Sequence, residues 1–100
     1  MPNPIDDPSR PLYSVGQVAD LLDVQQPFLR RLDQQDLVSP ARSAGSQRRY
    51  SRNDMDAVVA ICQLIDEGLT LEGVRRVLAL QAEVADLKSQ LAKARAKLAR

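Results

Sequence analysis

The chain has 100 residues, and its 14 lysines and arginines nearly balance its 13 aspartates and glutamates, giving a formal net charge of +1. This length suits one small domain with an appendage and leaves little room for a large enclosed pocket. There is no histidine and only one cysteine, which removes the commonest general base, the commonest metal ligand and any disulfide framework. Composition therefore weighs against an enzyme, a resident metal and a cofactor.

Residues 1–12 are expected to form a disordered tail. Four prolines, two aspartates and an arginine fall within residues 1–11, and nothing there resembles the apolar core of a signal peptide. No run in the sequence approaches the ~20 apolar residues needed to span a bilayer. We therefore expect a cytoplasmic protein that has no membrane partner.

A helix-turn-helix is expected over residues 14–36. Its first helix begins at a capping box formed by Ser14 and Gln17, and apolar residues recur at helical spacing as far as Leu22. After a two-residue turn, Pro27 suits the first turn of the second helix, because its ring fixes a helical φ and its missing amide needs no partner there. The second helix ends within the last two residues of the range.

A two-stranded hairpin, or wing, is expected next. Residues 37–40 leave the second helix in an extended direction, residues 43–46 supply a flexible turn, and residues 47–50 return as the second strand. Six arginines lie between Phe28 and Arg52 against two aspartates, which leaves a local excess of about four positive charges. Because the whole chain is nearly neutral, this excess is a patch, and such a patch attracts phosphate.

Two further helices complete the predicted elements. Ser51, with Asp54 three residues later, caps a third helix that stops at Gly68. Its apolar face is expected to consist of Met55, Val58, Val59, Cys62 and Ile65. Thr70 caps a fourth helix that has no strong stop signal before Arg100, although weak capping signals leave a break near residues 80 and 81 open.

An apolar stripe follows the fourth helix at heptad spacing. Its members alternate steps of three and four residues: Val77, Leu80, Val84, Leu87, Leu91, Ala94 and Leu98. A stripe this narrow favours a coiled coil, so we expect a homodimer, and a helix folded back on its own domain is the alternative. An antiparallel pair sets Glu83 beside the partner's Lys97, whereas a parallel pair sets it beside the partner's Lys88. Charge therefore does not choose the direction.

Several short motifs, in a fixed order, resemble the amino-terminal half of MerR-family transcription regulators. The motifs are Tyr13-Ser14-Val15-Gly16-Gln17-Val18-Ala19, Leu29-Arg30 with Asp33, Leu37-Val38-Ser39-Pro40, Arg48-Arg49-Tyr50-Ser51 with Asp54, and Glu67-Gly68-Leu69-Thr70-Leu71-Glu72-Gly73-Val74. The resemblance covers residues 13–80. Within the family, the helix that begins at Leu71 and the heptads after it are most similar to the heat-shock repressor branch.

The resemblance implies a mainly α fold, in which a winged helix-turn-helix with a two-stranded wing is followed by a long coiled-coil helix. It implies a DNA-binding domain over residues 13–80 and a dimerisation helix over residues 81–100, with an antiparallel coiled coil joining two copies. The second helix would enter the major groove of double-stranded DNA, and the wing would lie along the flanking backbone. By this match, phosphate would be bound by Arg30, Arg48, Arg49 and Tyr50.

Side chains near the start of the second helix are the candidates for reading base edges. They are Gln25, Gln26 and Phe28. The glutamines suit adenine edges, and Phe28 suits a thymine methyl group, although packing beneath the wing is an equal alternative for this ring. Many relatives carry Gly, Ser and Thr where this chain has Asp23, Gln25 and Phe28, so we do not expect an inherited base preference.

Three further residues have structural alternatives beside a functional role. Arg31 is a candidate for phosphate binding, and a surface ion pair with a nearby aspartate competes with that role. For Arg49, the alternative is a structural tie to the first two helices. Cys62 occupies an apolar helical position, where a free cysteine behaves as a small buried hydrophobe, so neither a redox role nor a metal site is expected.

The residues and the resemblance together predict a sequence-specific DNA-binding transcriptional regulator, expected to be a repressor that binds an inverted repeat as a homodimer. An architectural or excisionase-like factor that binds direct repeats is the first alternative. An adaptor whose last helix recruits a protein co-regulator is the second. No small-molecule effector domain is expected, and the sequence specifies neither the operator, nor the target genes, nor the inducing signal.

Overall fold

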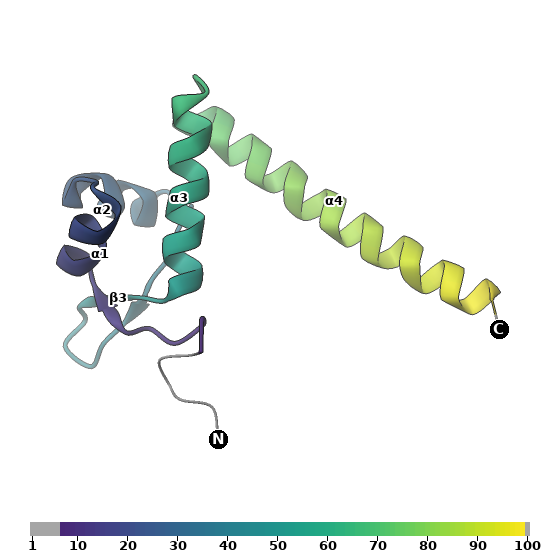
Figure 1. Ribbon diagram of the computed structural model, residues 1–100, viewed down its shortest axis with the longest axis horizontal. Coiled ribbons are helices and arrows are strands. Elements are labelled where there is room, and N and C mark those ends of the chain that lie inside the picture. Colours follow the sequence, from purple (N-terminus) through teal and green to yellow (C-terminus); the bar gives the residue numbers. More distant parts are fainter. Residues whose placement is uncertain (1–6, 100) are drawn as a thin grey trace. The chain divides into compact units, whose positions relative to one another are not determined.

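The computed structural model describes residues 7–99 and confirms the mainly α fold with a small wing and a long last helix. In chain order the elements are β1 (Tyr13–Ser14), α1 (Val15–Leu22), α2 (Gln26–Gln34), β2 (Ala41–Arg42), β3 (Arg48–Tyr50), α3 (Arg52–Asp66) and α4 (Leu71–Leu98) (Figure 1). The chain divides between Gln63 and Leu64 into two compact units. The first unit holds the sheet, α1, α2 and most of α3, and the second holds the end of α3 and α4.

Helix α1 begins at the predicted capping box. The Gln17 N–H donates to Ser14 Oγ at 3.2 Å, and the Ser14 N–H donates to Gln17 Oε1 at 2.8 Å. The helix ends at Asp23, whose backbone is left-handed at a φ of 54° and whose N–H bonds to the Ala19 carbonyl. Helix α2 carries Pro27 in its first turn, as predicted. Residues 23–25 form the short turn between the two helices.

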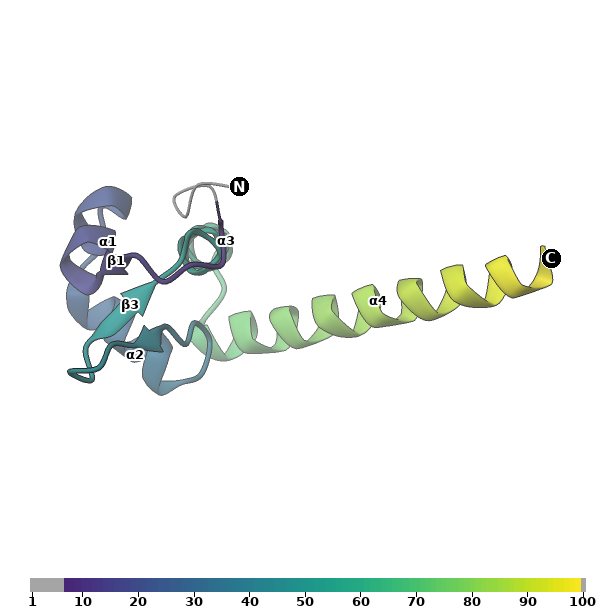
Figure 2. The same cartoon turned by 90° about the horizontal axis from the view of Figure 1, so that it is seen from below.

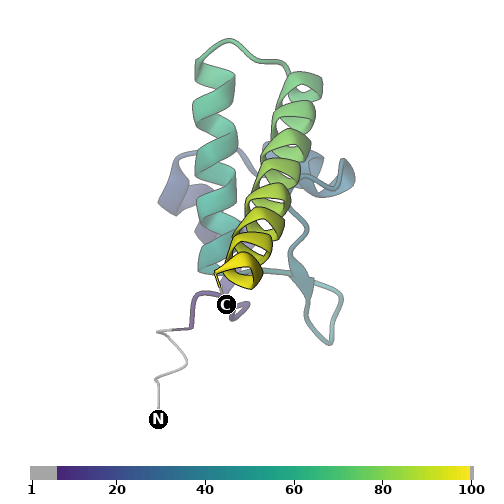
Figure 3. The same cartoon turned by 90° about the vertical axis from the view of Figure 1, so that its right-hand side faces the viewer.

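The wing belongs to a three-stranded antiparallel sheet in the order β1-β3-β2 (Figure 2). The register pairs Tyr13 with Tyr50, Ser14 with Arg49, Ala41 with Arg49, and Arg42 with Arg48. The β2–β3 hairpin was expected, but β1 was not, because two residues are too short to show a strand period. Pairing with β1 ties the wing to the start of α1, while the loop between β2 and β3 projects beyond this unit's helices (Figure 3).

The first unit buries a compact apolar core. Its buried apolar side chains are Val18, Ala19, Leu29, Leu32, Val38, Tyr50, Val58 and Ile61. The predicted apolar face of α3 was therefore partly wrong, since Ile61 is buried whereas Val59 is 41% exposed and Cys62 is half-buried. The face that meets the core is rotated from the one that the apolar pattern favoured, because core contacts rather than hydrophobic spacing decide which side of the helix turns inward.

Part of the expected tail can be placed. Residues 1–6 of that tail lie outside the described residues. The Leu12 N–H donates to the Tyr50 carbonyl, and the Asn53 N–H donates to the Pro8 carbonyl, both at 3.0 Å. This stretch therefore runs along the end of β3 and the start of α3, and the order of the first unit begins before residue 13.

The second unit is dominated by one continuous helix. Gly68 has a φ of 102° in the link that follows α3, and Thr70 Oγ1 accepts the Gly73 N–H at 3.2 Å to cap α4. Helix α4 then runs to Leu98 without the break considered near residue 80, so the boundary expected at residues 80 and 81 falls inside it. Every described residue of the stretch 79–99 is exposed.

Candidate nucleic-acid interface

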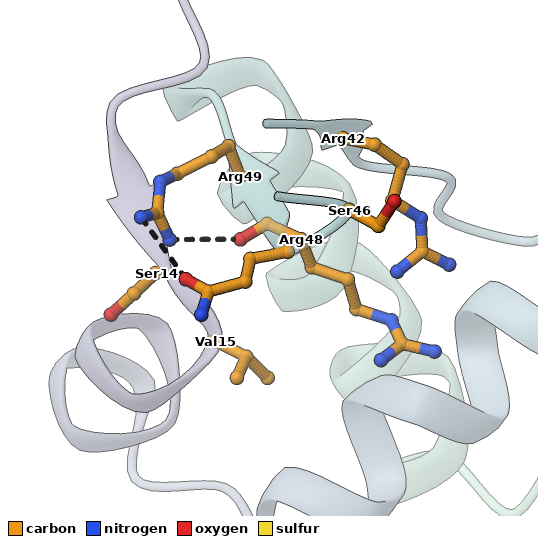
Figure 4. A pocket seen from close by; sticks show the side chains of 7 residues that line it. Ser14, Val15, Arg42, Ser46, Arg48 and Arg49 are labelled. Carbon is orange, nitrogen blue, oxygen red and sulfur yellow. Dashed lines mark hydrogen bonds between the residues drawn. The ribbon is translucent and has the colours of Figure 1, made fainter. Parts of the chain in front are cut away.

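A concave hollow of about 380 Å³ lies between the wing and the start of α1. Its walls are formed by Ser14, Val15, Arg42, Ser46, Gln47, Arg48 and Arg49 (Figure 4). The capping box uses the N–H groups of Ser14 and Gln17, so the first-turn N–H groups of Val15 and Gly16 have no partner inside the helix. Helix N-terminal amides and arginine forks both favour anions, so this hollow suits a backbone phosphate.

Arg49 is the arginine whose charge faces this hollow without a counter-charge. Its Nη1 donates to the Arg48 carbonyl at 3.3 Å and its Nη2 to Gln47 Oε1 at 3.4 Å, so neutral groups of its own hairpin hold it. Within residues 7–99 it forms no ion pair, and its side chain makes no hydrogen bond to α1 or α2. Arg49 is therefore connected to the start of α1 through its backbone, which pairs with that of Ser14, and not through its side chain.

Arg48 points to the opposite side of the strand, because successive residues of a strand alternate between faces. Figure 4 shows the Arg42 and Arg48 side chains extending to one side and that of Arg49 to the other. Arg48 Nε donates to Asp33 Oδ2 at 2.7 Å, and Arg42 Nη2 donates to the same oxygen at 2.9 Å. Asp33 lies in α2, so part of the donor capacity expected for phosphate is used inside the domain.

The link through Asp33 was not predicted from the sequence. Asp33 belongs to the motif that carries the family resemblance, but no role was assigned to it. The available signal was its charge: it is one of two aspartates between Phe28 and Arg52, where six arginines also lie. The sequence does not show which arginines it pairs with, since that depends on how the hairpin folds over α2.

Tyr50, one of the expected phosphate contacts, is buried in the core. Its side chain is 0% exposed, and its hydroxyl is buried without a hydrogen-bond partner among the described residues. Burial in the core raises the pKa of this phenol above its usual value near 10. Tyr50 lies two residues beyond Arg48 and shares its inward face of β3, so its hydroxyl lies in the core and not at the surface.

The candidates on α2 lie mostly at the surface. Gln25, Gln26, Arg30 and Arg31 are exposed, and Phe28 is half-buried. Arg30 Nη2 donates to Gln26 Oε1 at 3.2 Å, and a Cβ on Gly16 would lie 3.6 Å from Gln26 Nε2. The start of α2 therefore lies beside the start of α1. In the described part of the chain Arg31 makes no ion pair, so the pairing considered for it is not observed.

The predicted heptad stripe is largely uncovered. Leu87 is 54% exposed and Leu91 is 50% exposed, and of the seven stripe residues only Val77, at the start, is half-buried. No cluster of three or more side chains able to hold a metal ion occurs within residues 7–99. None of the helices described there has the length and apolar character required to cross a membrane.

Comparisons with known proteins agree on one family. A sequence profile described as "MerR HTH family regulatory protein" matches residues 13–81. The chain is 35% identical over 88 residues to the "HTH-type transcriptional regulator GlnR" of Bacillus anthracis, which covers 85% of this chain and 68% of that protein. It is 38% identical over 89 residues to the "Putative heat shock protein HspR" of Streptomyces coelicolor, covering 88% of this chain and 59% of that protein.

Two solved structures have the same fold. One is HiNmlR, described as a MerR family regulator lacking the sensor domain and bound to promoter DNA, with a TM-score of 0.60 at 18% identity. That match covers 86% of this chain and 77% of the other. The second is a MerR-family transcriptional regulator from Bacillus cereus, with a TM-score of 0.57 at 19% identity, covering 81% and 78%. At these identities the similarity shows the fold alone.

Proposed function

Because this chain belongs to the MerR HTH family of regulatory proteins, we propose that it is a sequence-specific transcriptional regulator that binds an inverted repeat as a homodimer. Membership confirms the resemblance read from the sequence and places the chain among regulators rather than enzymes. The observation that carries the DNA-binding proposal is Arg49, whose unpaired charge faces a hollow shared with the start of α1.

In the proposed complex, the wing and the start of α1 hold the backbone while α2 enters the major groove. Arg49 and the positive amino-terminal end of α1 bind one phosphate, and Arg30 and Arg31 bind phosphate from the exposed side of α2. Arg48 contributes through the two Nη groups that Asp33 does not engage. These contacts set register and affinity, but they carry no direct base information.

Base reading is proposed for the start of α2. Gln25 and Gln26 are exposed there, and Phe28 offers the uncovered part of its ring. A guanidinium has only donors, so the Gln26 atom facing Arg30 must be the amide oxygen. The Nε2 donors of Gln26 face away from that contact, so Gln26 is arranged to donate to an acceptor on a base edge, such as the N7 of the adenine edges considered from the sequence.

We propose that residues 13–80 form the DNA-binding domain and residues 81–100 the dimerisation helix. The exposed stripe on α4 supports this proposal, since a second copy would cover it. In an antiparallel pair, Glu83 would lie beside the partner's Lys97 at two symmetric positions, while Lys88 would face its own copy, so the direction is proposed from the family and not from charge. Two domains related in this way would read two half-sites of opposite orientation.

Repression is the proposed output. A dimer that occupies promoter DNA excludes polymerase without any further part, whereas activation requires a specific distortion of the promoter. A protein co-regulator remains part of the adaptor alternative, in which the exposed face of α4 takes a different partner.

Selection of the intact protein against a random duplex library tests the proposal, because it reports site sequence, symmetry and spacing together. We expect enrichment of an inverted repeat with a fixed spacing. Direct repeats would favour the architectural or excisionase-like alternative. A pool without any enriched sequence would contradict sequence-specific binding.

A further inference from the structure

Asp33 joins the wing to the helix proposed to enter the groove. Its side chain is only 13% exposed, and one of its oxygens, Oδ2, accepts from both Arg48 Nε and Arg42 Nη2. These two arginines lie on different strands of the hairpin. Through this one carboxylate, α2 is joined to both strands of the hairpin, while backbone hydrogen bonds from Leu37 and Val38 to the Leu32 carbonyl hold the start of the connection to β2.

The rest of the hairpin is attached on its other side. Strand β3 pairs with β1, which fixes one edge of the sheet to the start of α1, whereas β2 is the free edge. The loop that joins β2 to β3 carries Ser46 in a left-handed conformation at a φ of 62°. Beyond the connection through residues 37–40, the side-chain contact that holds the free edge over α2 is the one at Asp33.

Because Asp33 is largely buried, moving the two arginines away from it would cost free energy. A carboxylate that is largely removed from water requires its partners, because an unpaired charge there is costly. Asp33 also cancels one of the positive charges that the wing would otherwise present to DNA. The same side chain thus limits both the freedom of the wing and the general attraction of the patch for phosphate.

We infer that Asp33 is a positioning residue for site discrimination: it fixes the wing relative to the base-reading start of α2, and it restrains binding to unrelated DNA. The inference rests on the proposed function as a sequence-specific DNA-binding protein. It predicts that loss of the carboxylate separates affinity from specificity, so that the protein binds DNA readily but distinguishes its site poorly.

The test compares Asp33→Asn with Asp36→Asn. Both variants remove one negative charge, but Asp36 is exposed, makes no ion pair within residues 7–99, and has a φ of 57° that asparagine tolerates. Affinity is measured for the selected site and for an unrelated duplex of equal length, over a range of salt concentrations. Amide hydrogen exchange in residues 41–50 reports the freedom of the wing.

For Asp33→Asn we expect the ratio of specific to unrelated affinity to fall roughly 10-fold or more, with affinity for the unrelated duplex unchanged or raised by about 2- to 3-fold. Exchange in the hairpin should quicken while exchange in the core of α3 stays slow. For Asp36→Asn, both affinities should move together by less than about 3-fold.

An Asp33→Asn protein that keeps the ratio of Asp36→Asn would overturn the inference and leave the proposed function intact. A wild-type protein that does not distinguish any site from unrelated DNA would instead contradict the proposed function itself. If Asp33→Asn does not fold, Asp33→Glu keeps the charge and moves the carboxylate by one methylene group. A ratio below the wild-type value then supports the inference, and an unchanged ratio contradicts it.

Discussion

The two units of this chain handle apolar surface in opposite ways. The first closes a core of its own around Leu29, Leu32, Val58 and Ile61 and places its charge at the rim. In the second unit, every residue of the stretch 79–99 is exposed, although leucines recur along this helix at heptad spacing. The first unit therefore has an apolar core of its own, whereas the stripe on α4 is left open, as the dimer proposal requires.

The largest effect is expected from charges placed in the stripe on α4. Leu87→Asp combined with Leu91→Asp should yield monomers in sedimentation, since each buried leucine supplies about 1.5–3 kcal/mol and a buried unpaired carboxylate is costly. Affinity for the inverted repeat should drop about 100-fold or more, because two linked half-site contacts become separate ones.

The matched control places two carboxylates elsewhere on the same helix. Ser89→Asp with Ala92→Asp adds the same charge outside the stripe and should leave the dimer intact. Persistence of the dimer in the Leu87 and Leu91 variant would remove the coiled-coil proposal, while the first unit should keep its thermal transition in either variant.

A second change tests the charged rim of the first unit. Arg49→Ala should weaken binding to matched and unrelated duplexes alike, by roughly 5- to 30-fold, and should reduce the salt slope by about one. Filter binding or fluorescence anisotropy at several salt concentrations measures both quantities. Arg10→Ala removes the same charge outside the hollow, and an equal loss in that variant would show that Arg49 has no special place.

Gln26→Ala tests whether base reading in the first unit is separate from its general affinity for DNA. It should change the preference among sites by about 1–3 kcal/mol while affinity for unrelated DNA stays the same. Repeating the library selection with the variant measures this shift, and Gln34→Ala, at the far end of α2, is the control. An unaltered site preference would mean that Gln26 does not touch a base.

The smallest effect is expected at Tyr50. Tyr50→Phe should leave DNA affinity unchanged, because the hydroxyl is buried, and should leave stability equal or higher by up to about 1 kcal/mol, because that hydroxyl has no partner. Denaturant unfolding at neutral pH measures the stability term, and DNA titration measures the affinity. A drop in DNA affinity with unchanged stability would restore Tyr50 as a phosphate contact.

The Tyr50→Phe variant should also differ from the wild-type protein in how its stability depends on pH. The raised pKa of Tyr50 means that the folded state keeps its proton more tightly than the unfolded state. Stability from this group is therefore complete below about pH 10 and is lost as the pH rises towards the folded-state pKa. Tyr50→Phe should lack that alkaline loss in unfolding experiments above pH 10, whereas Tyr13→Phe, which retains Tyr50, should show it.

Local chemistry explains what could be predicted from the sequence. The starts of α1 and α4 follow from side chains that cap the backbone a few residues away, as Ser14 and Thr70 do. The stripe on α4 and the hairpin likewise depend on short-range spacing. Family membership, read from motif order, supplied the arrangement of these pieces.

Tertiary contacts explain what could not be predicted. Strand β1 exists only because β3 lies beside it, and the burial of Tyr50 depends on which face of β3 meets the core. The double contact of Asp33 requires the hairpin to be folded over α2 first. The inward side of α3 was misjudged at Val59 for the same reason: spacing defines a face but not its rotation towards neighbours.

Ser14 and Ser51 each stand where a strand turns directly into a helix. Ser14 closes β1 and caps α1, while Ser51, directly after β3, accepts the Asp54 N–H at the start of α3. No loop residue separates β1 from α1, Ser51 alone separates β3 from α3, and β1 and β3 are paired in the sheet. Added length at either corner would shift a helix start by a whole residue, whereas added length at residues 44 and 45, at the tip of the wing, would shift none.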